Sequence, residues 1–135
     1  MLINQIPIFG ICLGMQLMLS KSDEGNLEGL SWVDGVSKKF SDQELAVPHM
    51  GWNTVSIEKD SSLFFNFESV KRFYFVHSYF ADNPSIEAII GNTDYSTNFA
   101  SALTIKNLFA VQFHPEKSHS AGLQLLENFI GWDGS

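Results

Sequence analysis

Gly10-Ile11-Cys12-Leu13-Gly14 is the stretch of sequence that decides the fold. It follows an apolar, β-branched run over residues 6–11 that is typical of a buried strand. Residues 13–20 come next and predict a helix, with Leu13, Leu17 and Met18 along one apolar stripe. Gly-x-Cys-x-Gly at such a strand-to-helix junction is the cysteine form of the nucleophile elbow. We therefore expect an α/β fold with a reactive thiol where a strand ends.

The layout of this elbow suits Cys12 as a nucleophile. The side chain sits in a sharp, strained turn, and glycines at 10 and 14 remove Cβ atoms that would clash with the helix. We expect the helix N-terminus to lower the pKa of the thiol, and the backbone N–H of Leu13 to face a developing oxyanion. The alternative is a turn that happens to contain a cysteine, since a lone Cys is often a small buried hydrophobe.

His114 and Glu116 are the candidates for a base and its orienting acid. His114 ends the apolar strand predicted over residues 108–113, and Pro115 stops that strand, so the ring can project from the end of the sheet. Glu116 can reach back to the imidazole and fix its tautomer, as in a catalytic triad. A nucleophilic thiol needs such a base and proton donor. The competing interpretation is a capped strand end with a surface His and Glu.

Four further polar side chains are candidates for a substrate pocket. Gln16 lies one helical turn after Cys12, on the same face. A buried amide needs a partner, and either a polar substrate or nearby backbone would supply it, so both remain open. His77, in an aromatic strand predicted over residues 73–80, is a rival base. We interpret it instead as a strand-end residue near the pocket, with Ser78 and Tyr79 offering polar atoms to a substrate.

The two remaining histidines are not expected to act in catalysis. His49 lies in Pro-His-Met-Gly-Trp-Asn (48–53), which we predict to be a loop that forms a structural turn or a partner surface. His119 opens the last predicted helix, and we expect it to be exposed. None of the four histidines has metal-ligand spacing, so we expect neither a metal site nor a cofactor.

The remainder of the chain predicts mostly strands. After a polar loop over residues 21–31, strands are predicted at 47–57, 73–80, 87–92, 99–105 and 108–113, with helices at 61–67 and 120–130. Lys106-Asn107 predicts a two-residue hairpin turn, because Asn tolerates positive φ. Little sequence precedes the first strand. Either later strands supply both of its neighbours, or an N-terminal portion is missing.

Composition limits the classes of function. A chain of 135 residues with 44% hydrophobic content predicts one domain, over residues 1–135, with a real core. A net charge of −7 argues against nucleic-acid binding, which needs a basic face. One cysteine excludes an intrachain disulfide and fits a reducing compartment. The apolar run over residues 7–19 is too short to span a bilayer and lacks signal-peptide features, so we expect a soluble, cytoplasmic protein without a membrane partner.

Four blocks in a fixed order resemble the class I (triad) glutamine amidotransferases. They are Gly-Ile-Cys-Leu-Gly-Met-Gln (10–16), Val-Pro-His-Met-Gly-Trp-Asn (47–53), Phe-Val-His-Ser-Tyr (75–79) and Val-Gln-Phe-His-Pro-Glu-Lys-Ser (111–118). The second and third are similar to the glutaminase subunits of imidazole glycerol phosphate synthases, in histidine biosynthesis. The resemblance implies a flavodoxin-like three-layer sandwich, here lacking its first strands and the Gly-rich loop that supplies a second oxyanion donor.

The resemblance also implies a mechanism. Cys12 would attack the side-chain amide of glutamine, His114 would protonate the departing ammonia and then activate water, and Glu116 would orient His114. Gln16 would hold the bound glutamine, in a pocket lined by His77, Ser78 and Tyr79. Ammonia would pass through a tunnel to a synthase or cyclase subunit of a heterodimer. The segment facing that partner would be His49, Met50, Gly51, Trp52 and Asn53.

Three alternatives to this function remain open at this point. Residues 29–35 and 117–120 also resemble paralogous subunits that supply ammonia to an amidotransferase of a surface-sugar pathway. A truncated, catalytically impaired homologue would bind the partner without chemistry. A stand-alone cysteine hydrolase acting on γ-glutamyl peptides would need no partner, and the 48–53 segment argues against it.

Overall fold

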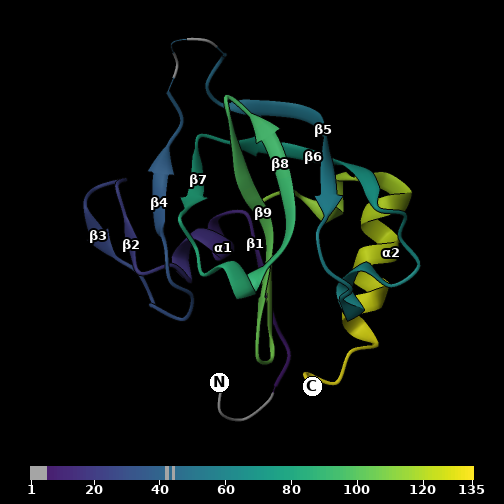
Figure 1. Ribbon diagram of the computed structural model, residues 1–135. Coiled ribbons are helices and arrows are strands. Elements are labelled where there is room, and N and C mark those ends of the chain that lie inside the picture. The colour runs from purple at the N-terminus through teal and green to yellow at the C-terminus, as the bar shows by residue number, and fades with distance from the viewer. Residues whose placement is uncertain (1–5, 42, 44) are drawn as a thin grey trace.

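One mixed sheet organises the computed structural model, which describes residues 6–41, 43 and 45–135 (Figure 1). Its main path runs β3-β2-β4-β7-β9-β8-β5-β6, and β10 branches from β9 to carry β1. The strands are β1 (Ile8–Ile11), β2 (Lys21–Ser22), β3 (Leu27–Glu28), β4 (Val36–Lys39), β5 (His49–Ile57), β6 (Val70–His77), β7 (Tyr79–Asp82), β8 (Ile89–Tyr95), β9 (Thr97–Ile105) and β10 (Leu108–Val111).

Helices are few in the described part of the chain. The α-helices are α1 (Leu13–Leu17) and α2 (His119–Ile130), and the 3₁₀ turns are η2 (Ser62–Phe64), η3 (Ile86–Ala88) and η4 (Pro115–Lys117). Figure 1 shows α1 behind β7 and α2 beyond β5 and β6. None of these helices is long and apolar enough to cross a membrane.

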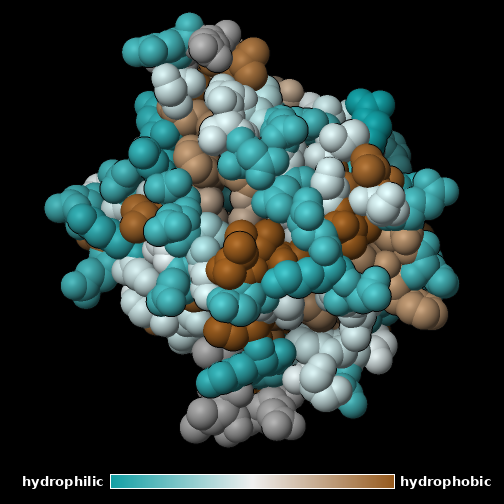
Figure 2. Space-filling view, viewed as in Figure 1, coloured by the Kyte–Doolittle hydropathy of each residue, from teal (hydrophilic) through white to brown (hydrophobic). Residues whose placement is uncertain are grey.

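The core lies on both faces of β10. Phe109 and Val111 join one cluster of buried side chains, whereas Leu108 and Ala110 join another, as expected for alternation along a strand. Helix α2 contributes to the first cluster, and α1 contributes to the second. The two helices therefore cover opposite faces, and the predicted layered α/β arrangement is confirmed. Polar and apolar residues alternate in small patches on the face shown in Figure 2.

The parallel pair β1–β10 positions the elbow. Ile11 pairs with Val111, and both strands end at the same edge of the sheet. The residues that follow, Cys12 and Gln112, are therefore neighbours in space. Within the described residues β1 pairs with β10 alone, so later strands do not supply both of its neighbours.

Helix α1 differs from its prediction in length and in its buried side. It ends at Leu17, and the side chains of Leu13 and Leu17 are exposed. Met15 and Met18 are buried against the second cluster instead. The predicted apolar stripe was wrong, because a single turn of helix buries whichever side faces the sheet.

Several strand predictions also needed correction. The predicted loop over residues 48–53 is mostly strand β5, and the predicted loop over residues 21–31 contains the short pair β2–β3. The aromatic strand of residues 73–80 is interrupted at Ser78, between β6 and β7. The hairpin turn at 106–107 is confirmed, but the residue with positive φ is Lys106 (51°).

Candidate active site

Cys12 occupies a strained turn between β1 and α1. Its backbone has φ 54° and ψ −104°, a region that a residue with a side chain rarely adopts, and its N–H donates to the Val111 carbonyl at 2.8 Å. A Cβ atom on Gly10 would lie 2.6 Å from Met18 Cε and 3.1 Å from the Gly14 carbonyl carbon, so this position is crowded, as predicted, mainly by the end of the Met18 side chain. A Cβ on Gly14 would meet nothing within 4 Å, so the predicted clash there was wrong.

The thiol lies in a partly buried, hydrogen-bonded environment. Its Sγ donates to the Val76 carbonyl at 3.7 Å and accepts from Gln112 Nε2 at 3.6 Å. Burial raises the pKa of Cys12, while the Leu13 N–H and Gln112 lower it and the Glu116 charge raises it. The net direction is upward, so the predicted lowering was wrong. Helix α1 has only 5 residues, and its N–H groups do not offset desolvation.

His114 and Glu116 form the predicted contact. His114 follows β10 at the start of η4, and its Nδ1 lies 2.8 Å from Glu116 Oε2. With Nδ1–H donating to the carboxylate, Nε2 is left as the ring's basic nitrogen. The His114 ring is not among the hydrogen-bond partners of the Cys12 thiol in the described residues.

Ser118 fixes the backbone around His114, which the sequence analysis did not anticipate. The Ser118 hydroxyl donates to the His114 carbonyl at 2.6 Å and accepts from the Tyr74 N–H at 2.9 Å. The His114 N–H in turn donates to the Tyr74 carbonyl at 2.8 Å. Residue 114 is thus tied to strand β6 at both of its backbone polar groups.

Gln112 is the side chain at the site that sequence reasoning missed. It is fully buried, and its amide bridges Cys12 Sγ (Nε2, 3.6 Å) and Gln16 Nε2 (Oε1, 3.2 Å). The sequence did contain an indication of this role, because Gln112 interrupts an otherwise apolar run and a buried amide requires hydrogen-bond partners.

Gln16 points toward the same place from α1. Its Nε2 donates to the Tyr79 carbonyl at 3.1 Å and to Gln112 Oε1 at 3.2 Å. Protein groups therefore satisfy both of its donors, as one of the two open interpretations required. Its Oε1 has no protein partner in the described part of the chain, so contact with a substrate stays a prediction.

His77 is neither a free base nor an open lining residue. The ring is buried at the end of β6, with Nδ1 2.7 Å from the Tyr79 carbonyl and Nε2 2.9 Å from His49 Nδ1. Burial lowers the pKa of His77 to about 4. Both nitrogens are occupied by protein groups, so the predicted role of this ring in offering polar atoms to a substrate finds no support in its contacts. The Ser78 carbonyl accepts from the Phe40 N–H at 3.0 Å.

The 49–53 segment presents alternate residues to solvent. Met50 and Trp52 are 62% and 40% exposed, whereas His49 is 3% exposed. The loop predicted here is therefore strand β5, and the burial of His49 gives no support to the expectation that it faces a partner. Gly51 and Asn53 are half-buried. The described residues contain no group of three or more His, Cys, Asp or Glu side chains that could hold a metal ion.

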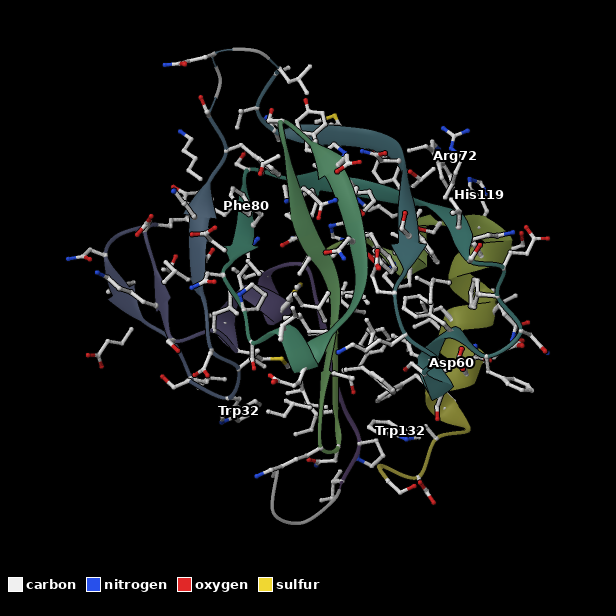
Figure 3. The ribbon with its side chains drawn as sticks, viewed as in Figure 1. Trp32, Asp60, Arg72, Phe80, His119 and Trp132 are labelled. Carbon is white, nitrogen blue, oxygen red and sulfur yellow. The ribbon has the colours of Figure 1, made fainter. Side chains whose placement is uncertain are left out.

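His119 is exposed, as predicted, and extends the surface formed by Trp52. The two rings stack with centroids 5.4 Å apart. Figure 3 shows His119 and Arg72 at the same outer corner of the molecule, beside the start of α2, whereas Phe80 lies on β7. This corner is separate from the aromatic cluster around His49, in which Phe80 stacks on Phe40.

The elbow, the His–Glu pair and the layered sheet together define a class of protein. Residues 1–132 match the family described as Glutamine amidotransferase class-I. The chain belongs to the class I glutamine amidotransferase family.

Among its relatives, the chain is similar to imidazole glycerol phosphate synthase subunits HisH. It is 46% identical over 133 residues to that of Neisseria gonorrhoeae, covering 93% of this chain and 63% of the relative. It is 45% identical over 130 residues to that of Leptospira interrogans, covering 93% and 64%. It is 46% identical over 128 residues to that of Methanocaldococcus jannaschii, covering 94% and 64%. The chain thus spans a little under two thirds of these relatives' length.

Solved structures share the fold. A Trypanosoma brucei CTPS glutaminase domain with bound acivicin superimposes with a TM-score of 0.65 at 23% identity, over 97% of this chain and 62% of that one. A glutamine amidotransferase from Thermotoga maritima gives a TM-score of 0.61 at 20% identity, over 96% and 49%. At these identities the likeness concerns the fold alone.

Proposed function

We propose that this chain carries a glutaminase centre, in which Cys12 is the nucleophile, His114 the proton carrier and Glu116 its orienting acid. The observation that carries the proposal is the parallel register of β1 and β10, because it brings the strained Cys12 elbow and the His114–Glu116 pair to one edge of the sheet. Family membership supports the same assignment.

The first half of the reaction forms a thioester. The raised pKa of Cys12 keeps the resting group a thiol, so a base must take its proton, and His114 Nε2 is the nitrogen not bonded to Glu116. Sγ then attacks the side-chain amide carbon of glutamine. As the C–N bond breaks, the His114 imidazolium gives its proton to the nitrogen, which leaves as ammonia. The Leu13 N–H at the elbow is the candidate donor to the oxyanion.

The second half releases glutamate. His114 takes a proton from water while the water oxygen attacks the thioester carbon. The C–S bond then breaks, glutamate leaves, and the proton returns to the Cys12 thiolate. The Glu116 carboxylate stabilises the imidazolium in both halves.

We further propose that the ammonia passes to a synthase partner that forms imidazole glycerol phosphate, in the cytoplasm. The similarity to imidazole glycerol phosphate synthase subunits HisH supports this acceptor over a surface-sugar amidotransferase. The exposed Met50 and Trp52 of β5, together with the stacked His119, form the candidate partner surface. Aromatic and Met side chains are enriched at the centres of such interfaces.

One observation favours a second candidate, a partner-binding module without catalysis. The Cys12 thiol is hydrogen-bonded to the Val76 carbonyl and to the Gln112 amide, and its pKa is raised. The two candidates differ in whether Cys12 reacts with a glutamine analogue when the partner is present.

The test is covalent labelling with diazo-oxonorleucine, read by intact mass and peptide mapping. The chain is incubated with a purified (β/α)₈ cyclase subunit and its substrate, and the Cys12→Ser variant is the control. We expect one adduct per chain, on Cys12, and none in the control. Absence of the adduct in the complex would leave the binding module as the function.

A further inference from the structure

Two buried histidines have no part in the proposed chemistry. His49 and His77 are direct partners across β5 and β6 and are 3% and 5% exposed. The His49 ring is stacked between Tyr95 (4.0 Å) and Phe75 (4.7 Å), and His77 lies 5.2 Å from the Phe40 ring. An apolar ring would fill this aromatic cluster without polar atoms to satisfy. Two imidazoles at such positions therefore indicate a role for their hydrogen bonds.

The protons in this group are fixed by Asn53. Its Nδ2 lies 3.0 Å from the Asp94 carbonyl, and its Oδ1 accepts the Thr54 N–H at 2.7 Å, which sets the orientation of the amide. The same Nδ2 lies 3.1 Å from His49 Nε2. An amide nitrogen only donates, so His49 Nε2 is the acceptor and the ring's proton is on Nδ1.

The same donor-to-acceptor direction of the hydrogen bonds continues through the His77 ring. His49 Nδ1–H donates to His77 Nε2 at 2.9 Å, which places the His77 proton on Nδ1. His77 Nδ1–H then donates to the Tyr79 carbonyl at 2.7 Å. Every donor along the path from Asn53 to Tyr79 thus has one acceptor, and both rings are neutral.

The Tyr79 carbonyl links this series of hydrogen bonds to the Cys12 thiol. Its oxygen also accepts from Gln16 Nε2 at 3.1 Å, and the same Nε2 donates to Gln112 Oε1 at 3.2 Å. Gln112 therefore turns its own Nε2 to Cys12 Sγ, at 3.6 Å. If the Gln112 amide were reversed, its oxygen would face the sulfur and would disfavour a thiolate.

Neutrality of the rings is a requirement of this arrangement. A second proton on His77 would set two N–H groups against each other between His49 and His77, and a second proton on His49 would set its Nε2–H against the Asn53 amide N–H. Burial lowers the pKa of both rings to about 4; at His77 the Tyr79 hydrogen bond opposes this lowering, and the nearby His49 and His114 contribute to it. Among the described residues, Tyr95 is a further titratable group that faces the pair, stacked on His49.

We propose that Asn53, His49 and His77 are positioning residues, which act through the Tyr79 carbonyl to hold Gln16 and Gln112 in the orientation that directs an N–H group at Cys12. The proposal rests on the proposed function only for the effect of these residues on catalysis, since the orientation of the Gln16 and Gln112 amides can be measured without glutamine. Removing a link releases the Gln16–Gln112 pair and withdraws the donor from the sulfur.

The first experiment measures the tautomers of the full chain by ¹⁵N–¹H NMR of the imidazole rings at pH 7. We expect both His49 and His77 to be neutral with the proton on Nδ1, which is the less common tautomer of free histidine. A proton on Nε2, or a charged ring, at either position would overturn the chain of donors.

The second experiment measures alkylation of Cys12 by iodoacetamide between pH 6 and 10. His49→Phe and His77→Phe keep the aromatic cluster filled but interrupt the series of hydrogen bonds. We expect alkylation of Cys12 at pH 7 to slow about tenfold, which corresponds to a thiol pKa about one unit higher. His49→Gln, whose amide can both accept and donate, should restore the rate to within about threefold of the native chain.

A matched control separates positioning from loss of stability. Thr93→Val removes another buried hydrogen bond of the same sheet, from Thr93 Oγ1 to Ser101 Oγ at 2.8 Å. We expect its alkylation rate to stay within about twofold of native, since no group beside the sulfur changes. Equal rates in His49→Phe, His77→Phe and Thr93→Val would contradict the proposal.

The outcomes are distinguishable from those for the glutaminase. If diazo-oxonorleucine fails to label Cys12 while the tautomers and alkylation rates are as expected, the positioning stands and the proposed reaction fails. If labelling succeeds but His49→Phe leaves the pH profile of alkylation unchanged, the reaction stands and the positioning fails.

Discussion

Gln112 Nε2 lies 3.6 Å from Cys12 Sγ because the residues before them, Val111 and Ile11, are direct partners in the parallel pair of β10 and β1. The thiol thus receives its hydrogen bond from the same strand whose end carries His114. A donor to the sulfur favours its charged form, whereas burial opposes it, and the balance lies on the side of burial.

Replacing Gln112 with Leu should make the thiol less reactive. The change removes the donor to Sγ, so the pKa of Cys12 rises further, and it leaves a Gln16 N–H without its acceptor. We expect alkylation at pH 7 to slow about tenfold and stability to fall by about 1–3 kcal/mol. The pH profile of iodoacetamide reaction and urea unfolding measure the two effects. An unchanged profile would show that the 3.6 Å contact has no effect on the sulfur.

Glu116→Gln should separate thiol reactivity from turnover. The Glu116 charge raises the pKa of Cys12, so its removal should leave alkylation as fast as native or slightly faster. Glutamine hydrolysis in the complex should nevertheless fall about 100-fold or more, because a neutral amide does not stabilise the His114 imidazolium. If both rates fall together, Glu116 acts on the sulfur's surroundings rather than on His114.

Acid should destabilise the fold through the two buried rings. Their pKa values are about 4 in the folded chain against 6.5 for an ordinary histidine, so the unfolded chain binds more protons between these values. Stability is therefore complete above pH 6.5 and is lost as the pH falls toward 4, by about 3 kcal/mol per ring. Urea unfolding at a series of pH values measures this slope. The His49→Phe, His77→Phe double variant should show a much flatter curve; an equal slope would assign the effect to other groups.

The two glycines of the elbow should respond oppositely to alanine. Gly10→Ala places a Cβ 2.6 Å from Met18 Cε and should cost about 1–2 kcal/mol, since the buried Met18 must move. Gly14→Ala meets open space inside α1 and should be neutral or stabilise by up to about 1 kcal/mol. Shifts in the urea midpoint measure both. Adding Met18→Ala should relieve the Gly10→Ala clash, and a lack of coupling between these two changes would exclude the contact as the cause.

Local patterns were enough to predict the elbow, the His114–Glu116 pair and α2. Each depends on residues close in sequence: a strand running into Cys12, a carboxylate two positions from an imidazole, and a run of helical spacing before Ile130. The physical rules for these features act within one or two turns of chain, and the positions of all three features are as predicted.

Features that depend on distant pairings were not predictable in this way. His49 was assigned to a loop because nothing local shows that it pairs with His77, 28 residues away. Gln112 was passed over because its partners, Cys12 and Gln16, lie about 100 residues earlier in the chain. The exposure of Leu13 and Leu17 followed from which face of α1 meets the sheet, and that is a property of the assembled core.

Strand β5 has a mechanical consequence for the site. Its outward row, Met50 and Trp52, and its inward row, His49 and Asn53, belong to one stiff backbone, so neither row can shift without the other. We therefore expect a displacement of the outer row by a bound partner to change the 2.9 Å distance between His49 Nδ1 and His77 Nε2. Strand β5 would thus couple contacts on the exposed face of the sheet to the hydrogen bonds that His49 and Asn53 make on the other face.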